Sequence, residues 1–122
     1  MENLINWIEI PAKDINRATT FYRSILGLEI DVREMFGSKM GFFPSDGQNV
    51  SGAIVQGEDY NPSSNGIVAY LNGGNDLNRV LNKVEEHNGK VMLAKTQISP
   101  EMGYFAMFID TEGNKMALHS IA

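Results

Sequence analysis

The sequence repeats itself at a fixed spacing of 62 residues. The segment DINR at residues 14–17 returns as DLNR at 76–79, Gly27 returns as Gly89, and MGFF at 40–43 returns as MGYF at 102–105. Three separate matches at one spacing are typical of an internal duplication rather than of chance. We therefore expect the 122 residues to form two copies of one small structural unit.

Each copy contains one amphipathic helix. In the first copy Asp14 is the expected N-cap, apolar residues follow at helical spacing, and Gly27 ends the helix. In the second copy Asp76 and Gly89 take the same two places. A helix that is apolar along one side covers one face of a sheet.

Strand-like runs surround each helix. One run precedes each helix, LINWIEI and GIVAYL, and three follow it, near residues 28–33, 39–44 and 52–56, and near 90–95, 103–109 and 115–120. The sequence therefore predicts an α+β fold of two βαβββ modules, residues 1–58 and 65–122, within a single domain spanning 1–122. Asp14 and Asp76 should then occupy equivalent positions.

The composition limits the partners of the chain. With 43% hydrophobic and 20% charged residues and no apolar run long enough to span a bilayer, we expect a globular protein without a membrane partner. The N-terminus lacks the pattern of a secretory signal, so a cytoplasmic location is the default expectation. A net charge of −5 argues against nucleic acid as a partner. Without cysteine, a metal would need histidine, carboxylate or amide ligands.

Two stretches carry a family resemblance. The opening WIEIPAKDINRATTFYRSILGLEI and the closing MGYFAMFIDTEGNKMALHS resemble the vicinal-oxygen-chelate superfamily, which includes glyoxalase I, extradiol dioxygenases, methylmalonyl-CoA epimerase and bleomycin-resistance proteins. The resemblance covers essentially the whole chain. It implies that the two modules form a U-shaped cup of mixed β-sheet with the helices on the outside, usually in a homodimer.

The resemblance also indicates where metal-dependent members carry their ligands, on the first and fourth strands of each module. The four positions fall on Trp7, near Val55, within residues 66–69, and on Ala117. None of these residues offers a metal donor, so we expect neither a metal nor another cofactor. A displaced site made of Glu9, His119 and one further donor, with Gln56 available if the register shifts, stays open as an alternative.

His119 and Glu9 are the candidate polar groups of the cup. Strands alternate between two faces, so His119 shares a face with Ala117, and Glu9 shares one with Trp7. Three interpretations remain open: His119 is a hydrogen-bonding residue of the cup wall, it forms an acid/base pair with Glu9, or both belong to the displaced metal site. His87, at a helix end, is assigned no function.

Two classes of function follow from these residues. The first is a metal-independent protein of the bleomycin-resistance type, which binds a small organic molecule without breaking a bond. The second is a lyase, isomerase or dioxygenase of the glyoxalase type, which uses Glu9 and His119 or a displaced metal. In either class the candidate ligand-binding residues are Trp7, Gln56, Tyr104, Met107 and Ala117.

Overall fold

The computed structural model describes residues 3–122, so residues 1 and 2 of the predicted first module lie outside the described residues. The first module consists of β1 (Trp7–Pro11), α1 (Ile15–Leu26), β2 (Asp31–Met35), β3 (Ser38–Phe42) and β4 (Ser51–Gln56). The second consists of β5 (Tyr70–Asn72), α2 (Asn78–Val84), the short 3-10 helix η1 (Glu85–His87), β6 (Lys90–Ser99), β7 (Gly103–Ile109) and β8 (Lys115–Ser120).

Each module forms a four-stranded mixed sheet. The strand orders are β1-β4-β3-β2 in the first sheet and β5-β8-β7-β6 in the second. In both sheets the first strand pairs in parallel with the last, and the other pairs are antiparallel. The prediction of an α+β fold with two βαβββ modules is confirmed, and Asp14 and Asp76 each lie between the first strand and the helix of their module.

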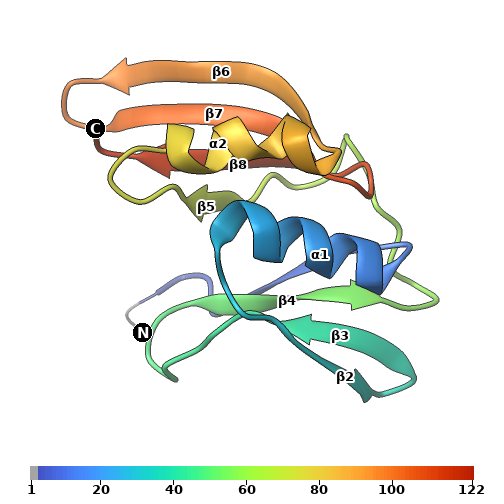
Figure 1. The fold of residues 1–122 in the computed structure, drawn as a ribbon. Coiled ribbons are helices and arrows are strands. Elements are labelled where there is room, and N and C mark those ends of the chain that lie inside the picture. Colours follow the sequence, from blue (N-terminus) through green and yellow to red (C-terminus); the bar gives the residue numbers. More distant parts are fainter. Residues whose placement is uncertain (1–2) are drawn as a thin grey trace.

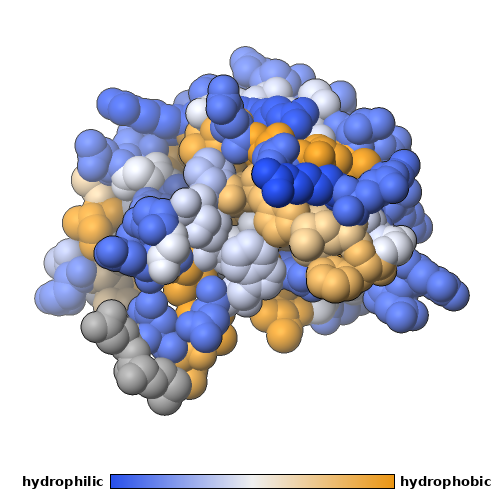
Figure 2. Space-filling view, turned by 90° about the horizontal axis from the view of Figure 1, so that it is seen from below, coloured by the Kyte–Doolittle hydropathy of each residue, from blue (hydrophilic) through white to orange (hydrophobic). Residues whose placement is uncertain are grey.

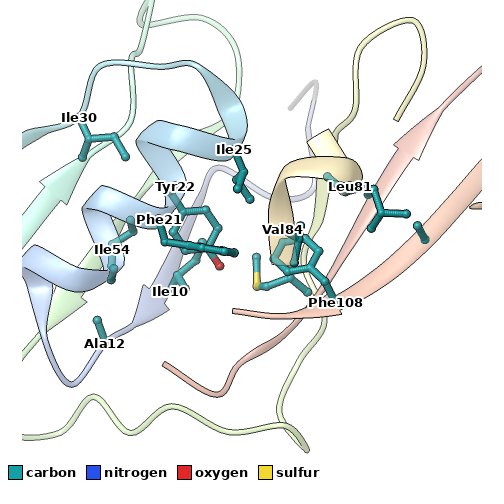
Figure 3. Close-up of a cluster of buried hydrophobic side chains, with 14 of the residues drawn as sticks. Ile10, Ala12, Phe21, Tyr22, Ile25, Ile30, Ile54, Leu81, Val84 and Phe108 are labelled. Atoms are coloured by element: carbon teal, nitrogen blue, oxygen red, sulfur yellow. The ribbon is translucent and has the colours of Figure 1, made fainter. Parts of the chain in front are cut away.

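The two helices lie next to each other and join the modules (Figure 1). Phe21 on α1 packs against Phe108 on β7, with ring centroids 6.0 Å apart. Figure 3 shows Phe21 and Tyr22 directed toward Val84 and Phe108 across this junction. Because side chains from both modules build one core, neither module buries its apolar helix face alone. No helix within residues 3–122 is long and apolar enough to cross a membrane.

The second helix differs from its prediction at both ends. Its N-cap is Leu77 rather than Asp76, although Asp76 Oδ1 still accepts a hydrogen bond from the Asn78 N–H at 3.0 Å. The left-handed residue at the end of η1 is Asn88, with a φ of 76°, rather than Gly89. Gly89 has another role, because a Cβ there would lie 2.8 Å from side-chain atoms of Phe21 and Val84.

The strand predicted from GIVAYL is shorter than expected. Only Tyr70–Asn72 pairs with β8, and Ile67 is 99% exposed. The cause lies in the bonding of β8, where the Lys115 N–H donates to Ser63 O and the Ala117 N–H donates to Ala69 O. These two N–H groups are neighbours on one edge of β8, but the carbonyls that they bond are six residues apart in the chain. The residues between Ser63 and Ala69 therefore loop away from the sheet.

A polar network ties the turn between β7 and β8 to the start of α1. Asp110 is buried and accepts a hydrogen bond from the Tyr22 hydroxyl at 2.6 Å. Burial, together with the negative charge and hydrogen bond of Asp110, holds the pKa of Tyr22 well above its ordinary value. Asn114 donates to Asp110 and to Pro11 O, so the network spans both modules.

Candidate ligand-binding site

Each sheet has one face covered by the helices and one face free of them. In the first sheet Ile10 and Ile54 point toward α1 and are fully buried. The alternating residues Trp7 and Glu9 point to the helix-free face. In the second sheet Phe108 and Leu118 point toward the helices, which leaves Met107, Ala117 and His119 on the helix-free face.

A cavity of about 680 Å³ lies at the helix-free face of the second sheet, near the end of β8. Its lining combines a histidine, an amide and an aromatic ring with apolar side chains. The residues are Tyr70, Leu71, Asn72, Gly74, Ile98, Met102, His119, Ser120 and Ile121. An apolar lining with a few polar groups is the usual character of a small-molecule site.

Within residues 3–122 one side-chain hydrogen bond holds His119 in place. Its Nε2 lies 2.6 Å from the carbonyl oxygen of Met102. A carbonyl only accepts, so Nε2 carries the proton, and Nδ1 is an acceptor whenever the ring is neutral. On β5, Asn72 pairs with His119 in the register, and Tyr70 lies 6.4 Å from Phe105 between ring centroids. The wall therefore presents a hydrogen-bonding imidazole beside two aromatic rings.

The helix-free face of the first sheet carries a carboxylate among aromatic side chains. The Tyr60 hydroxyl donates to Glu9 Oε1 at 2.5 Å, and Trp7 lies 6.2 Å from Phe42 between ring centroids. The hydrogen bond to Glu9 is the main cause that raises the pKa of Tyr60, with burial and nearby negative charge adding to it. The phenol therefore stays a neutral donor over the physiological pH range.

Glu9 and His119 are not brought together within this chain. Each has its own hydrogen-bond partner, Tyr60 for Glu9 and the Met102 carbonyl for His119. Glu9 is also absent from the lining of the cavity at His119. The acid/base pair considered from the sequence therefore gains no support from the contacts of residues 3–122.

The other predicted ligand-binding residues separate into two groups. Met107 and Ala117 pair with each other on the helix-free face that carries His119. Tyr104 packs against the main core, and Lys95 Nζ lies 4.7 Å from its ring centroid, so its ring is not on that face. Gln56 Oε1 accepts a hydrogen bond from the Ile15 N–H at 2.8 Å, which gives Gln56 a capping role at the start of α1.

The positions at which metal-dependent members of the family carry their ligands hold residues without metal donors in this chain. Trp7 is 42% exposed, while Val55 and Ala117 are fully buried by their neighbours. Within residues 3–122 no group of three histidine, aspartate or glutamate side chains is placed to hold a metal ion. Glu9 and His119 thus lack the further acidic or histidine ligand that a displaced site would need.

Of the residues that line the cavity, sequence reasoning named only His119, and Tyr70, Asn72 and Met102 are among those it missed. Tyr70 and Asn72 lie on β5, whose register depended on the length of the loop that follows it, and that length is not repeated between the modules. A signal for Met102 existed, because MGYF at 102–105 repeats MGFF at 40–43. This repeat predicted the strand, but it did not predict that the Met102 carbonyl would bond His119.

The comparisons with known proteins agree with this fold. The family model for the Glyoxalase/Bleomycin resistance protein/Dioxygenase superfamily matches residues 4–118. The chain belongs to this superfamily. A glyoxylase-like domain-containing protein of Didymella fabae is 30% identical over 117 residues, which cover 93% of this chain and 91% of that protein. The resemblance seen in the sequence is thereby confirmed.

Solved structures of low sequence identity show the same fold. A glyoxalase I variant from Zea mays matches 95% of this chain with a TM-score of 0.75 and 15% identity, and the chain spans 46% of that protein's length. TnmS3, an antibiotic binding protein from Streptomyces sp. CB03234, matches 98% of this chain and 97% of its own, with a TM-score of 0.65 and 17% identity. These identities establish the fold alone.

Proposed function

We propose that this protein binds a small organic molecule in the cavity at His119, without the help of a metal. The observation that carries the proposal is the cavity of about 680 Å³, in which the His119 ring lies beside Tyr70 and Asn72. The similarity to an antibiotic binding protein supports a binding function within the superfamily. The absence of metal donors at Trp7 and Ala117 points in the same direction.

The lining predicts the kind of molecule that binds. Tyr70 and the nearby Phe105 favour a flat or apolar group that is held by burial against aromatic rings. His119 Nδ1 accepts a hydrogen bond from a ligand donor when the ring is neutral. Asn72 Oδ1 already accepts from the Gly74 N–H at 2.8 Å, which leaves its amide nitrogen to donate to a ligand acceptor. A flat molecule with one donor and one acceptor at its edge fits these groups.

Binding and a merely structural role of His119 can be separated with matched variants. Ligands are first sought by calorimetric titration of a set of flat, oxygenated organic compounds. His119→Ala and Tyr70→Ala should each weaken the affinity about tenfold, because each removes a side chain that lines the cavity. His87→Ala is the control, since His87 lies on η1 away from the cavity, and it should bind as the native protein does.

The melting temperature is measured in parallel. In a binding role, His119→Ala leaves it little changed. If that variant instead lowers the melting temperature by several degrees and binds with native affinity, the proposal is wrong, because a cost of about 1–2 kcal/mol would then belong to the fold.

A further inference from the structure

Three aromatic side chains share the helix-free face of the first sheet with Glu9, and the hydroxyl of one of them, Tyr60, bonds its carboxylate. In the register Glu9 pairs with Ala53, and Ala53 pairs with Phe42, so these residues form one row across β1, β4 and β3. Phe42 and Tyr60 pack against a small buried cluster that includes Ala53. Trp7 lies beside Phe42 and is 42% exposed. The rings thus cover the small alanine while their outer parts stay accessible.

The hydrophobic character of this side of the molecule is visible on the surface. Figure 2, seen from the side of the first module, shows hydrophobic residues to the right of the centre and smaller groups at the left and lower margins, among hydrophilic residues. An accessible apolar surface that contains a carboxylate is unusual, because an exposed glutamate is ordinarily surrounded by water or by cations.

Glu9 is not neutralised by a cationic side chain. The three ion pairs within residues 3–122 join Arg17 to Glu112, Arg33 to Asp31 and Lys95 to Asp76. The Tyr60 hydroxyl occupies Oε1 of Glu9, and no hydrogen bond within the described residues reaches Oε2. One carboxylate oxygen therefore has no hydrogen-bond partner among residues 3–122, on the sheet face that also carries Trp7, Phe42 and Tyr60.

We propose that Glu9, Trp7, Phe42 and Tyr60 form a binding site for a small organic cation, such as a quaternary or protonated amine. Aromatic faces attract cations, and rings of Trp, Tyr and Phe are the usual receptors of quaternary ammonium groups. The carboxylate of Glu9 adds a full negative charge at the same place. An alkylated ammonium fits better than a metal ion, because its methyl groups contact the rings without losing tightly held water.

The charged neighbours do not compensate this carboxylate. Arg33 lies on the same face but is engaged by Asp31 at 2.7 Å. Lys13 and Lys39 line a separate cavity of about 420 Å³ beside Tyr60, without an ion pair to Glu9. The net charge of −5 further favours a cation over an anion.

The chain carries its own reporter for this site, since Trp7 is the only tryptophan. The native protein is titrated with choline while the fluorescence of Trp7 is recorded. Dimethylbutanol, the uncharged carbon isostere of choline, is titrated in the same way, and sodium chloride controls for ionic strength. We expect a saturable change with choline, and an affinity for the uncharged isostere that is about tenfold or more weaker.

Glu9→Gln keeps an acceptor for Tyr60 but removes the charge, and it should weaken choline binding about tenfold. Glu29→Gln is the matched control, because it removes one exposed carboxylate elsewhere on the same module and should leave choline affinity unchanged. The inference is overturned by equal binding of choline and dimethylbutanol, by equal effects of the two variants, or by the absence of a saturable change. Because this titration reports on Trp7 and not on His119, its failure leaves the proposed function untouched.

Discussion

Arg17 on α1 forms two hydrogen bonds, of 2.7 and 2.9 Å, to the carboxylate of Glu112, which lies 95 residues later in the chain. The Glu112 side chain is fully buried, and that of Arg17 is half exposed. Glu112 also accepts hydrogen bonds from the N–H groups of Lys13 and Asp14, each at 2.9 Å. One carboxylate of the second module therefore holds the start of the helix of the first.

Removal of this carboxylate should destabilise the whole chain. Glu112→Ala leaves the Arg17 guanidinium and two backbone N–H groups without their partner, so we expect the free energy of unfolding to fall by roughly 3 kcal/mol. Urea titration monitored by circular dichroism measures it. The control is Glu101→Ala, at an exposed position, which should change the value by less than about 0.5 kcal/mol. Equal free energies of unfolding for the two variants would show that the hydrogen bonds of Glu112 do not stabilise the fold.

The same carboxylate should make stability depend on pH. Burial alone would raise the pKa of Glu112, but hydrogen bonds from Arg17, Thr111 and the Lys13 and Asp14 N–H groups outweigh it and lower the pKa. The folded value thus lies below the unfolded one, which is about 4.3 for an exposed glutamate. The stabilisation is fully present above that pH and is lost as the pH falls through the folded value.

Urea unfolding between pH 7 and pH 3 checks this dependence. The free energy of unfolding should fall more steeply in the native chain than in Glu112→Gln. Asp46 and Asp76, whose pKa values are also lowered by hydrogen bonds, contribute equally to both proteins. Parallel curves for the two proteins would show that Glu112 is not the group responsible.

We expect protein purified without a chelator to contain far less than one divalent metal ion per chain. The reason is the number of donors, since the expected ligand positions at Trp7 and Ala117 offer none and His87 lies at a helix end. Elemental analysis of the purified protein measures the content. Near one equivalent of zinc, nickel, iron or manganese, lost in His119→Ala but kept in His87→Ala, is the result that would favour the enzyme alternative.

We expect a homodimer in solution. Five exposed hydrophobic residues line one cavity of about 660 Å³ between the two sheets, namely Ile5, Leu28, Val50, Ile67 and Tyr70. The edge strands β1 and β5 are each unpaired on one side within the described residues. A second copy would cover these apolar side chains and strand edges. Light scattering should give twice the chain mass of 13.5 kDa.

A matched pair of variants locates the interface of that dimer. Ile67→Lys should shift the protein toward the monomer, because it places a charge where an apolar side chain is 99% exposed. Met92→Lys, at another exposed apolar position, should leave the dimer intact. A mass near 13.5 kDa for the native protein at tens of micromolar would contradict the prediction.

The repeat in the sequence was sufficient to predict the architecture, because helix caps and strand periodicity are local properties. Gly27 does adopt the left-handed conformation expected of it, with a φ of 65°. Gly89 does not, since its neighbour Asn88 takes that conformation and Gly89 instead makes room for Phe21. The contact with Phe21 joins the two modules, and no pattern within either module could predict it.

The candidate site was harder to predict, for a similar reason. Strand alternation correctly placed Ala117 and His119 on one face. It could not predict the partners of Glu9 and His119, because Tyr60 and Met102 lie in or beside loops whose path depends on the folded structure. Tyr104 was placed in the site although it packs on the core, since an aromatic residue suits either face of a strand equally well.

The shared core between α1 and α2 has a consequence for folding. In solenoid proteins each repeat contacts only its neighbours, so that stability is roughly a sum over repeats. Here the apolar sides of the two helices meet, and Phe21 of one half rests on Phe108 of the other. The duplicated halves should therefore melt in one cooperative transition. Two peptides made by opening the chain between residues 58 and 65 should remain unstructured apart and regain structure when mixed.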